Sequence, residues 1–97
     1  MRVIWSDEAY NVFEEIVIYL EGHFSEQSAR NFERRIEEAK EFIKKQPYAG
    51  RPSEVLDVRF WLIDGNRRMY YEVDELNQEI YILDIFDTRQ HPSKRKY

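Results

Sequence analysis

The fold is decided by residues 55–73, VLDVRFWLIDGNRRMYYEV, where two stretches of alternating side chains flank an Asp-Gly-Asn turn. Side chains that alternate at every second position are typical of β-strands. An Asp-Gly pair between two such stretches is a strong β-hairpin signal. The sequence therefore predicts an antiparallel hairpin with strands at 55–63 and 67–73. In the second strand we expect one face to carry Met69, Tyr71 and Val73 and the other to carry Arg68, Tyr70 and Glu72.

Two further strands are expected outside this hairpin. Residues 79–86 form a nearly continuous apolar stretch, which is typical of a strand that lies inside a sheet. Residues 2–5 are rich in β-branched and aromatic side chains and predict a short first strand. The polar residues 74–78 turn the chain between the hairpin and the last strand.

Between the first strand and residue 47 the apolar pattern changes to that of helices. Apolar residues recur at every third or fourth position, at Ala9, Phe13, Ile16 and Leu20 and then at Ala29, Phe32, Ile36, Ala39 and Ile43. Ser6 and Ser25 are the expected N-caps, and Gly22 and Pro47 are expected to end the two helices. The expected order is β-α-α-β-β-β, an α+β fold with the helical hairpin packed on one face of a small, mainly antiparallel sheet.

Length and composition indicate a single domain, residues 1–97. Ninety-seven residues suit one domain at about 100–200 residues per domain, and the 15% aromatic content is too high for a disordered chain. The absence of cysteine excludes a disulfide scaffold, a zinc–thiolate site and a cysteine nucleophile. His23 and His91 are the only histidines and stand 68 positions apart, so we expect no bound metal and no other cofactor.

Hydropathy and charge narrow the class of protein further. The longest apolar run, Ile16–Leu20, is far shorter than the about 20 residues of a membrane span, and the N-terminus has no signal-peptide stretch. We therefore expect a cytoplasmic protein without a membrane partner. The net charge of −4 argues against general nucleic-acid coating. The charge is uneven, because residues 85–97 carry four basic side chains and only one acidic one.

Arginines of the hairpin and the C-terminal tail are the candidate functional side chains. Arg59 and Arg68 are expected on the sheet face that the helices leave open, beside Trp61 and Tyr70. An arginine fork binds phosphate and stabilises the charge of an RNA-cleavage transition state, while a His or Tyr transfers protons. The tail supplies such groups in Arg89, His91, Lys94 and Tyr97. Solvated strand faces also carry Arg and Tyr without any function, so the pattern alone leaves both interpretations open.

Several short motifs follow one another along the chain. They are Trp5-Ser6 with Ala9, Ala29, residues 47–52 (PYAGRP), Arg59, residues 68–73 (RMYYEV) and residues 80–92 (IYILDIFDTRQHP). In this order and spacing they resemble the RelE/ParE superfamily, the toxins of type II toxin–antitoxin systems, over essentially the whole chain. The resemblance implies a cytoplasmic toxin that a cognate antitoxin holds inactive in a toxin–antitoxin hetero-oligomer.

The superfamily contains two mechanisms. RelE-like toxins enter the ribosomal A site and cut mRNA, whereas ParE-like toxins inhibit DNA gyrase without being nucleases. Our first expectation is ribosome-dependent mRNA cleavage, so that the partners are the antitoxin, the ribosome and mRNA. The alternatives are a ParE-like gyrase inhibitor and a decayed, non-toxic interaction protein. Two departures favour these alternatives: the chain is acidic, and residues 55–58 stand where RelE carries a pair of lysines.

The resemblance also implies roles for individual residues. Arg68 falls on the RelE-type arginine that contacts the scissile phosphate. Arg89 and Tyr97 fall loosely on a tail arginine and a tail tyrosine, and His91 on an acid–base histidine of some relatives. The expected catalytic residues are therefore Arg68, Arg89, His91 and Tyr97, and the expected substrate-binding residues are Arg51, Arg59 and Lys94. Trp61 and Ile63, expected on the open face, are the candidate antitoxin contacts.

Overall fold

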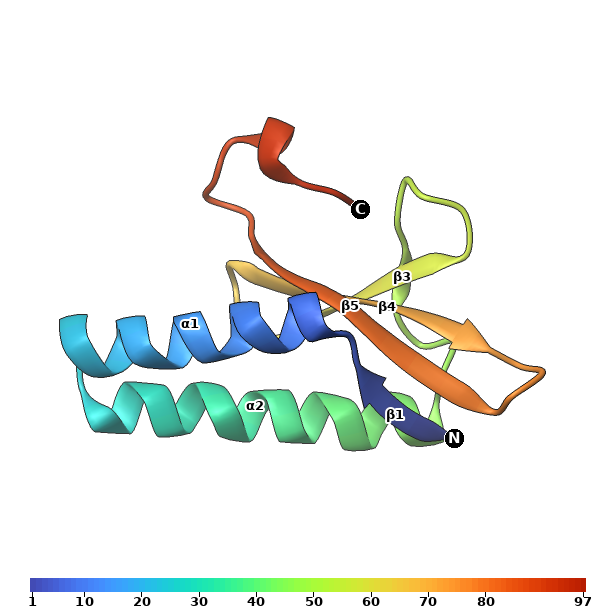
Figure 1. Cartoon of the computed structure of the whole chain (residues 1–97), viewed down its shortest axis with the longest axis horizontal. Coiled ribbons are helices and arrows are strands. Elements are labelled where there is room, and N and C mark those ends of the chain that lie inside the picture. Colours follow the sequence, from blue (N-terminus) through green and yellow to red (C-terminus); the bar gives the residue numbers. More distant parts are fainter.

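The computed structural model describes all 97 residues and has two layers, a helical hairpin and a five-stranded sheet (Figure 1). The elements are β1 (Arg2–Trp5), α1 (Asp7–His23), α2 (Glu26–Lys45), β2 (Arg51–Pro52), β3 (Val58–Leu62), β4 (Arg67–Asp74), β5 (Glu79–Asp87) and the 3₁₀ turn η1 (Pro92–Lys94). The predicted order is confirmed, with the short strand β2 added before the hairpin. Neither helix combines the length and the apolar character that a membrane span requires.

The two helices begin where their caps were predicted. The hydroxyls of Ser6 and Ser25 each accept a hydrogen bond, 3.0 Å long, from the backbone N–H three residues further on. The expected stop at Gly22 is wrong, because α1 continues to His23 and the N–H of Phe24 still donates to the carbonyl of Leu20. Gly22 does not adopt a positive φ, so it has no role as a left-handed helix terminator.

The sheet has the strand order β1-β5-β4-β3-β2, with β1 parallel to β5 and every other pair antiparallel. β5 thus lies inside the sheet, as its apolar character predicted. The predicted strand at 55–63 begins only at Val58, because the residues before it form a turn in which Asp57 has a left-handed backbone (φ 67°). The β4–β5 ladder shifts register between Tyr70 and Tyr71.

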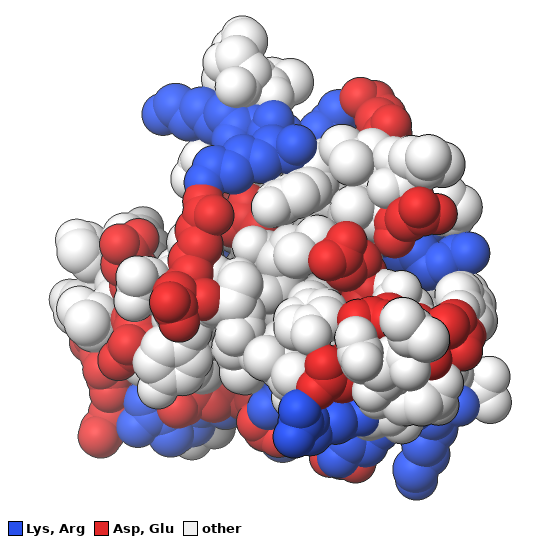
Figure 2. Space-filling model, turned by 45° about the vertical axis from the view of Figure 1, so that its right-hand side comes forward, with Lys and Arg blue, Asp and Glu red and all other residues white.

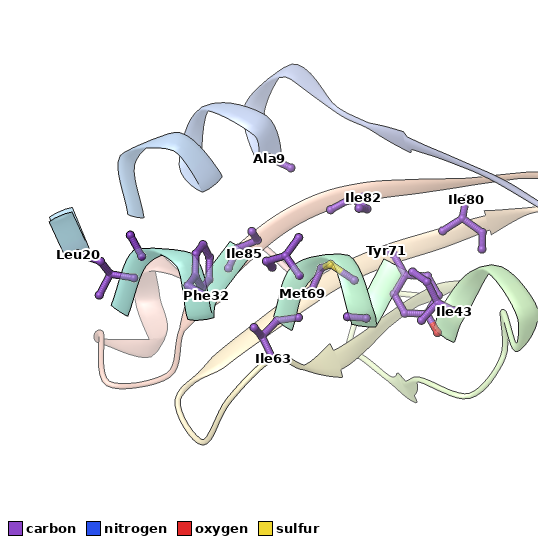
Figure 3. Close-up of a cluster of buried hydrophobic side chains, with 13 residues drawn as sticks. Ala9, Leu20, Phe32, Ile43, Ile63, Met69, Tyr71, Ile80, Ile82 and Ile85 are labelled. Atoms are coloured by element: carbon purple, nitrogen blue, oxygen red, sulfur yellow. The ribbon is translucent and has the colours of Figure 1, made fainter. Parts of the chain in front are cut away.

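The main core lies between the helices and the sheet (Figure 3). Thirteen buried residues form one cluster there: Ala9, Leu20, Ala29, Phe32, Ile36, Ala39, Ile43, Ile63, Met69, Tyr71, Ile80, Ile82 and Ile85. The helical stripes predicted from the sequence supply seven of them. The hydroxyl of Tyr71 donates to the carbonyl of Pro47 and accepts from the N–H of Gly50, so this buried phenol ties the α2–β2 connection to the sheet.

The predicted placement of Arg59, Trp61 and Ile63 on the open face is wrong. The register pairs Arg59 with Tyr71 and Trp61 with Met69, which puts both side chains on the helix-covered face. The ring of Trp61 stacks on Phe42 of α2 at 4.7 Å, and Ile63 is only 6% exposed. Both faces of β3 carry large apolar side chains, Trp61 beside Arg59 on one and Phe60 on the other, so alternation alone could not decide which face meets the helices.

Candidate functional site

Arg68 of β4 occupies the open face of the sheet, as predicted. Its guanidinium carbon lies 4.4 Å from the centroid of the Phe60 ring, and Nη1 donates to the hydroxyl of Tyr70 at 3.3 Å. The side chain is half-buried, and its Nε–H is buried without any hydrogen-bond partner. Two aromatic side chains thus hold the guanidinium without a carboxylate, which leaves its positive charge available to an anionic group.

The C-terminal tail folds back over this face. Figure 1 shows the tail on the side of the sheet opposite the helices. The ring of Tyr97 lies 5.9 Å from that of Tyr70, and both belong to a second apolar cluster with Val58 and Phe86. Arg95 forms an ion pair of 3.0 Å with Glu54, and Lys96 pairs with Glu8. The structure therefore brings Tyr97, far away in the sequence, next to Arg68 and Tyr70.

The charge around this place is mixed. Figure 2 shows Lys and Arg gathered at the top of the molecule, where Figure 1 places the tail, above a surface on which acidic side chains are scattered among uncharged ones. The basic C-terminal tail is thus attached to the more acidic remainder of the molecule by two ion pairs and one aromatic contact.

Asp84 is a polar member of the open face that sequence analysis missed. It is the cross-strand neighbour of Tyr70 and only 7% exposed. Its carboxylate accepts one hydrogen bond, 2.9 Å long, from the N–H of Ile85 and forms no ion pair. Burial raises the pKa of Asp84 above its ordinary value. The available signal was a lone acidic residue inside the apolar stretch 79–86, which a buried strand normally excludes.

Arg89 does not join Arg68. Its Nε and Nη2 both bond the carboxylate of Asp87, at 3.0 and 2.6 Å. These hydrogen bonds raise the pKa of Arg89 and lower that of Asp87. Arg89 lines a hollow of about 350 Å³ with Ile16 and Tyr19 of α1, on the side of the sheet that the helices cover. The predicted convergence of Arg68 with Arg89 is therefore absent from this structure.

His91 and Lys94 lie at the exposed turn η1. The Nδ1 atom of His91 accepts a hydrogen bond from the N–H of Ser93 at 3.1 Å and thereby caps this turn. Lys94 is exposed in the same turn. No hydrogen bond joins either residue to Arg68 or Tyr70. No group of three His, Cys, Asp or Glu side chains is arranged to hold a metal ion.

Arg59 braces the connection between α2 and β2. Its Nη1 donates to the carbonyl of Gly50 at 2.9 Å and to that of Tyr48 at 3.3 Å. The guanidinium also lies over the ring of Tyr48, 5.2 Å from its centroid. Arg51 is exposed on β2, at the far edge of the sheet from β1. The structure therefore places Arg59 on the opposite face from Arg68, in contact with the backbone. Arg51 shares the open face, because it pairs with Phe60, whose ring lies against Arg68.

Comparisons with known proteins agree with this fold. The family model of the ParE toxin of type II toxin–antitoxin systems, parDE, matches residues 3–92. A structure of the chromosomal ParDE toxin–antitoxin system of P. aeruginosa is similar, with a TM-score of 0.76, 24% identity, and coverage of 90% of this chain and 95% of that one. Curated protein sequences gave no match.

Two further solved structures share the fold at lower identity. The YoeB/ParE toxin from Agrobacterium tumefaciens has a TM-score of 0.67 at 14% identity, covering 90% of this chain and 98% of its own. The YoeB dimer from Staphylococcus aureus has a TM-score of 0.61 at 15% identity, covering 87% and 92%. Because the family model spans nearly the whole sequence, this chain belongs to the ParE toxin family and is the toxin of a type II toxin–antitoxin system.

Proposed function

We propose that this toxin inhibits DNA gyrase without cutting nucleic acid, and that the open face around Arg68 contacts the target. The observation that carries the proposal is that two of the four residues expected to catalyse RNA cleavage, Arg89 and His91, lie apart from Arg68 and Tyr97. Arg89 is held by Asp87 beside α1, and the Nδ1 atom of His91 caps an exposed turn. Acid–base cleavage requires such groups within hydrogen-bond reach of one phosphate.

The family and the solved structure that match this chain also support gyrase inhibition. The family model is that of ParE, and the ParDE structure covers nearly all of both chains. The net charge of −4 is also unsuited to a pocket formed by ribosomal RNA. Under this proposal the toxin works in the cytoplasm, where gyrase acts, and its partner in the resting state is the antitoxin.

Ribosome-dependent mRNA cleavage is the second candidate, and one observation favours it. Arg68 and Tyr97 come together through Tyr70, so an arginine and a terminal tyrosine lie on one surface. That pair could hold a phosphate and move a proton with the other groups of the site supplied by the ribosome.

Two assays on one preparation of folded toxin decide between these candidates. The proposal predicts that the toxin blocks supercoiling by purified gyrase and produces no new mRNA 5′ ends in a translating cell-free system. New ends at fixed codon positions that vanish when translation is blocked, with gyrase unaffected, would establish the second candidate instead. A folded protein that is inert in both assays would contradict both and support a decayed, non-toxic chain.

Two variants connect the activity to the open face. Arg68→Ala should abolish the inhibition, because it removes a guanidinium that lies against Phe60 on that face and that no carboxylate neutralises. Arg30→Ala is the matched control, since Arg30 is an exposed arginine of α2 whose ion pairs are with Glu21 and Glu33. Arg30→Ala should inhibit as the unmodified toxin does.

A further inference from the structure

The outer edge of β3 is only partly covered. β2 pairs with Arg59 and Phe60 and then ends. The N–H of Ile63 donates to the carbonyl of Arg67 at 2.9 Å, so the antiparallel alternation turns the N–H and C=O of Leu62 away from β4. No strand lies beside Leu62 on that outer edge. An unpaired strand edge of this kind is a template for an extended partner chain.

Two hollows adjoin this edge and meet at Trp61 and Leu62. One, of about 430 Å³, lies between α2 and β3 and is also lined by Phe42 and Ile63. The other, of about 220 Å³, is lined by Ala49, Arg51 and Phe60 together with the same two residues. Phe42 is 43% exposed and Leu62 is 48% exposed. Exposed aromatic and aliphatic side chains beside hollows are typical anchors of a protein interface.

The charge along these hollows is positive, although the whole molecule is acidic. Arg34, Arg35 and Arg51 line them, against one carboxylate, Glu38. Glu38 pairs with Arg34 at 3.4 Å, which leaves Arg35 and Arg51 without an ion pair. One arginine without an ion pair thus lines each hollow, and such a pair attracts a chain that carries acidic residues beside apolar ones.

We propose that this groove, formed by α2 and the free edge of β3, binds an extended acidic segment of the cognate antitoxin. The segment lies beside Leu62 as an added strand, places apolar side chains in the two hollows, and pairs carboxylates with Arg35 and Arg51. An RNA strand fits the edge less well, because it has no backbone amides to pair with Leu62 and no aliphatic side chains for the hollows. The inference rests on this protein being the toxin of a toxin–antitoxin pair, and it does not depend on the cellular target.

Charge reversal tests the groove. The probe is the antitoxin encoded in the same operon, separated from the co-expressed toxin and titrated against it by calorimetry. Arg35→Glu and Arg51→Glu should each weaken binding about ten-fold or more, because each replaces an attraction by a repulsion. Lys45→Glu is the control, an exposed cation at the end of α2 without an ion pair and outside the groove. It should bind within about two-fold of the unmodified toxin.

Hydrogen exchange gives a second readout that does not depend on the variants. The complex should protect the amide of Leu62 and leave the amides of the open face unchanged. Protection confined to the open face, or unchanged affinity of both arginine variants, would overturn the proposal. Protection of Leu62 in the free toxin as its concentration rises would show instead that a second copy of the chain covers the edge.

The outcome separates this inference from the proposed target. The free Arg35→Glu toxin should inhibit gyrase as the unmodified toxin does, because Arg35 lies on α2 and not on the open face. If the toxin leaves gyrase unaffected but antitoxin binding still requires Arg35 and Arg51, gyrase is not the target, and the proposed antitoxin groove is supported. If gyrase is inhibited but the antitoxin binds both arginine variants with unchanged affinity, the proposed target is supported and the proposed groove is wrong.

Discussion

The two faces of the sheet are covered in different ways. On one face, two helices of 17 and 20 residues bury a cluster of thirteen side chains. On the other, the buried residues are Val58, Tyr70, Phe86 and the polar Asp84, and the tail completes the cover of the apolar three with Tyr97. The first face contains the apolar contacts that stabilise the fold. The second face has a much smaller apolar cluster, also carries polar side chains and is partly open, so a functional side chain there costs little stability.

Two arginines on neighbouring strands show the same difference. The guanidinium of Arg59, on the helix-covered face, donates hydrogen bonds to the carbonyls of Tyr48 and Gly50. Arg68, on the open face, lies against the ring of Phe60 and keeps a buried Nε–H without a partner. A charged group with unused donors is the one able to bind another molecule, and its neighbour is part of the framework.

The largest effect is expected from a cavity on the helix-covered face. Ile82 of β5 is fully buried there among thirteen clustered side chains. Ile82→Ala should lower the free energy of unfolding by about 2–5 kcal/mol, because neighbouring side chains close such a cavity only in part. Urea denaturation followed by circular dichroism measures this change. A loss below 1 kcal/mol would mean that the helices do not supply the main core.

A smaller effect is expected from the tail. Tyr97→Ala removes a half-buried ring packed 5.9 Å from Tyr70. It should lower the free energy of unfolding by about 0.5–1.5 kcal/mol, the range for an aromatic pair. The same urea denaturation experiment measures this change. If Tyr97→Ala lowered the free energy of unfolding as much as Ile82→Ala, the two faces would contribute equally to stability, which would contradict the comparison.

The smallest effect concerns the buried carboxylate of the open face. Burial raises the pKa of Asp84 above its ordinary value of 3.8. A carboxyl group whose pKa is higher in the folded state favours folding while it is protonated, and this contribution is lost as the pH rises through the folded pKa. Asp84→Asn keeps the oxygen that accepts from Ile85 and should therefore raise the melting temperature at pH 7.

The pH dependence of the difference in melting temperature between Asp84→Asn and the unmodified toxin provides a control. Well below pH 3.8, the pKa of the unfolded carboxyl, the group is protonated in both states, so the melting temperatures of the variant and the unmodified toxin should converge. Calorimetric scans at several pH values compare them. A variant that melts lower at pH 7 would show that the carboxylate of Asp84 has a compensating partner.

Much of the fold was predictable from local signals. The caps at Ser6 and Ser25, the helical stripes and the Asp64-Gly65 turn each act within a few residues, so the sequence states them directly. The terminator assigned to Gly22 failed because a helix tolerates glycine near its end without changing its backbone angles. β2 was missed because two residues, Arg51 and Pro52, give no period to detect.

The site was less predictable because it depends on contacts between distant residues. The position of Arg68 followed from the alternation of β4, whose two faces differ clearly in polarity. The position of Arg59 did not, since both faces of β3 carry large apolar side chains and packing against the helices decides between them. The return of Tyr97 to Tyr70 depends on ion pairs from Arg95 to Glu54 and from Lys96 to Glu8, which no local pattern encodes. The functional roles assigned to these residues remain predictions.

We propose that the open face of the sheet acts on the target and that the helix-covered face maintains the fold. Expressing Arg68→Ala and Arg59→Ala without antitoxin, and measuring growth arrest alongside the melting temperature of each purified protein, tests it most directly. Arg68→Ala should lose toxicity with a nearly unchanged melting temperature. Arg59→Ala should stay toxic but lose about 1–3 kcal/mol of stability with its two carbonyl bonds. A fully toxic Arg68→Ala protein, or a stable but harmless Arg59→Ala protein, would contradict the account.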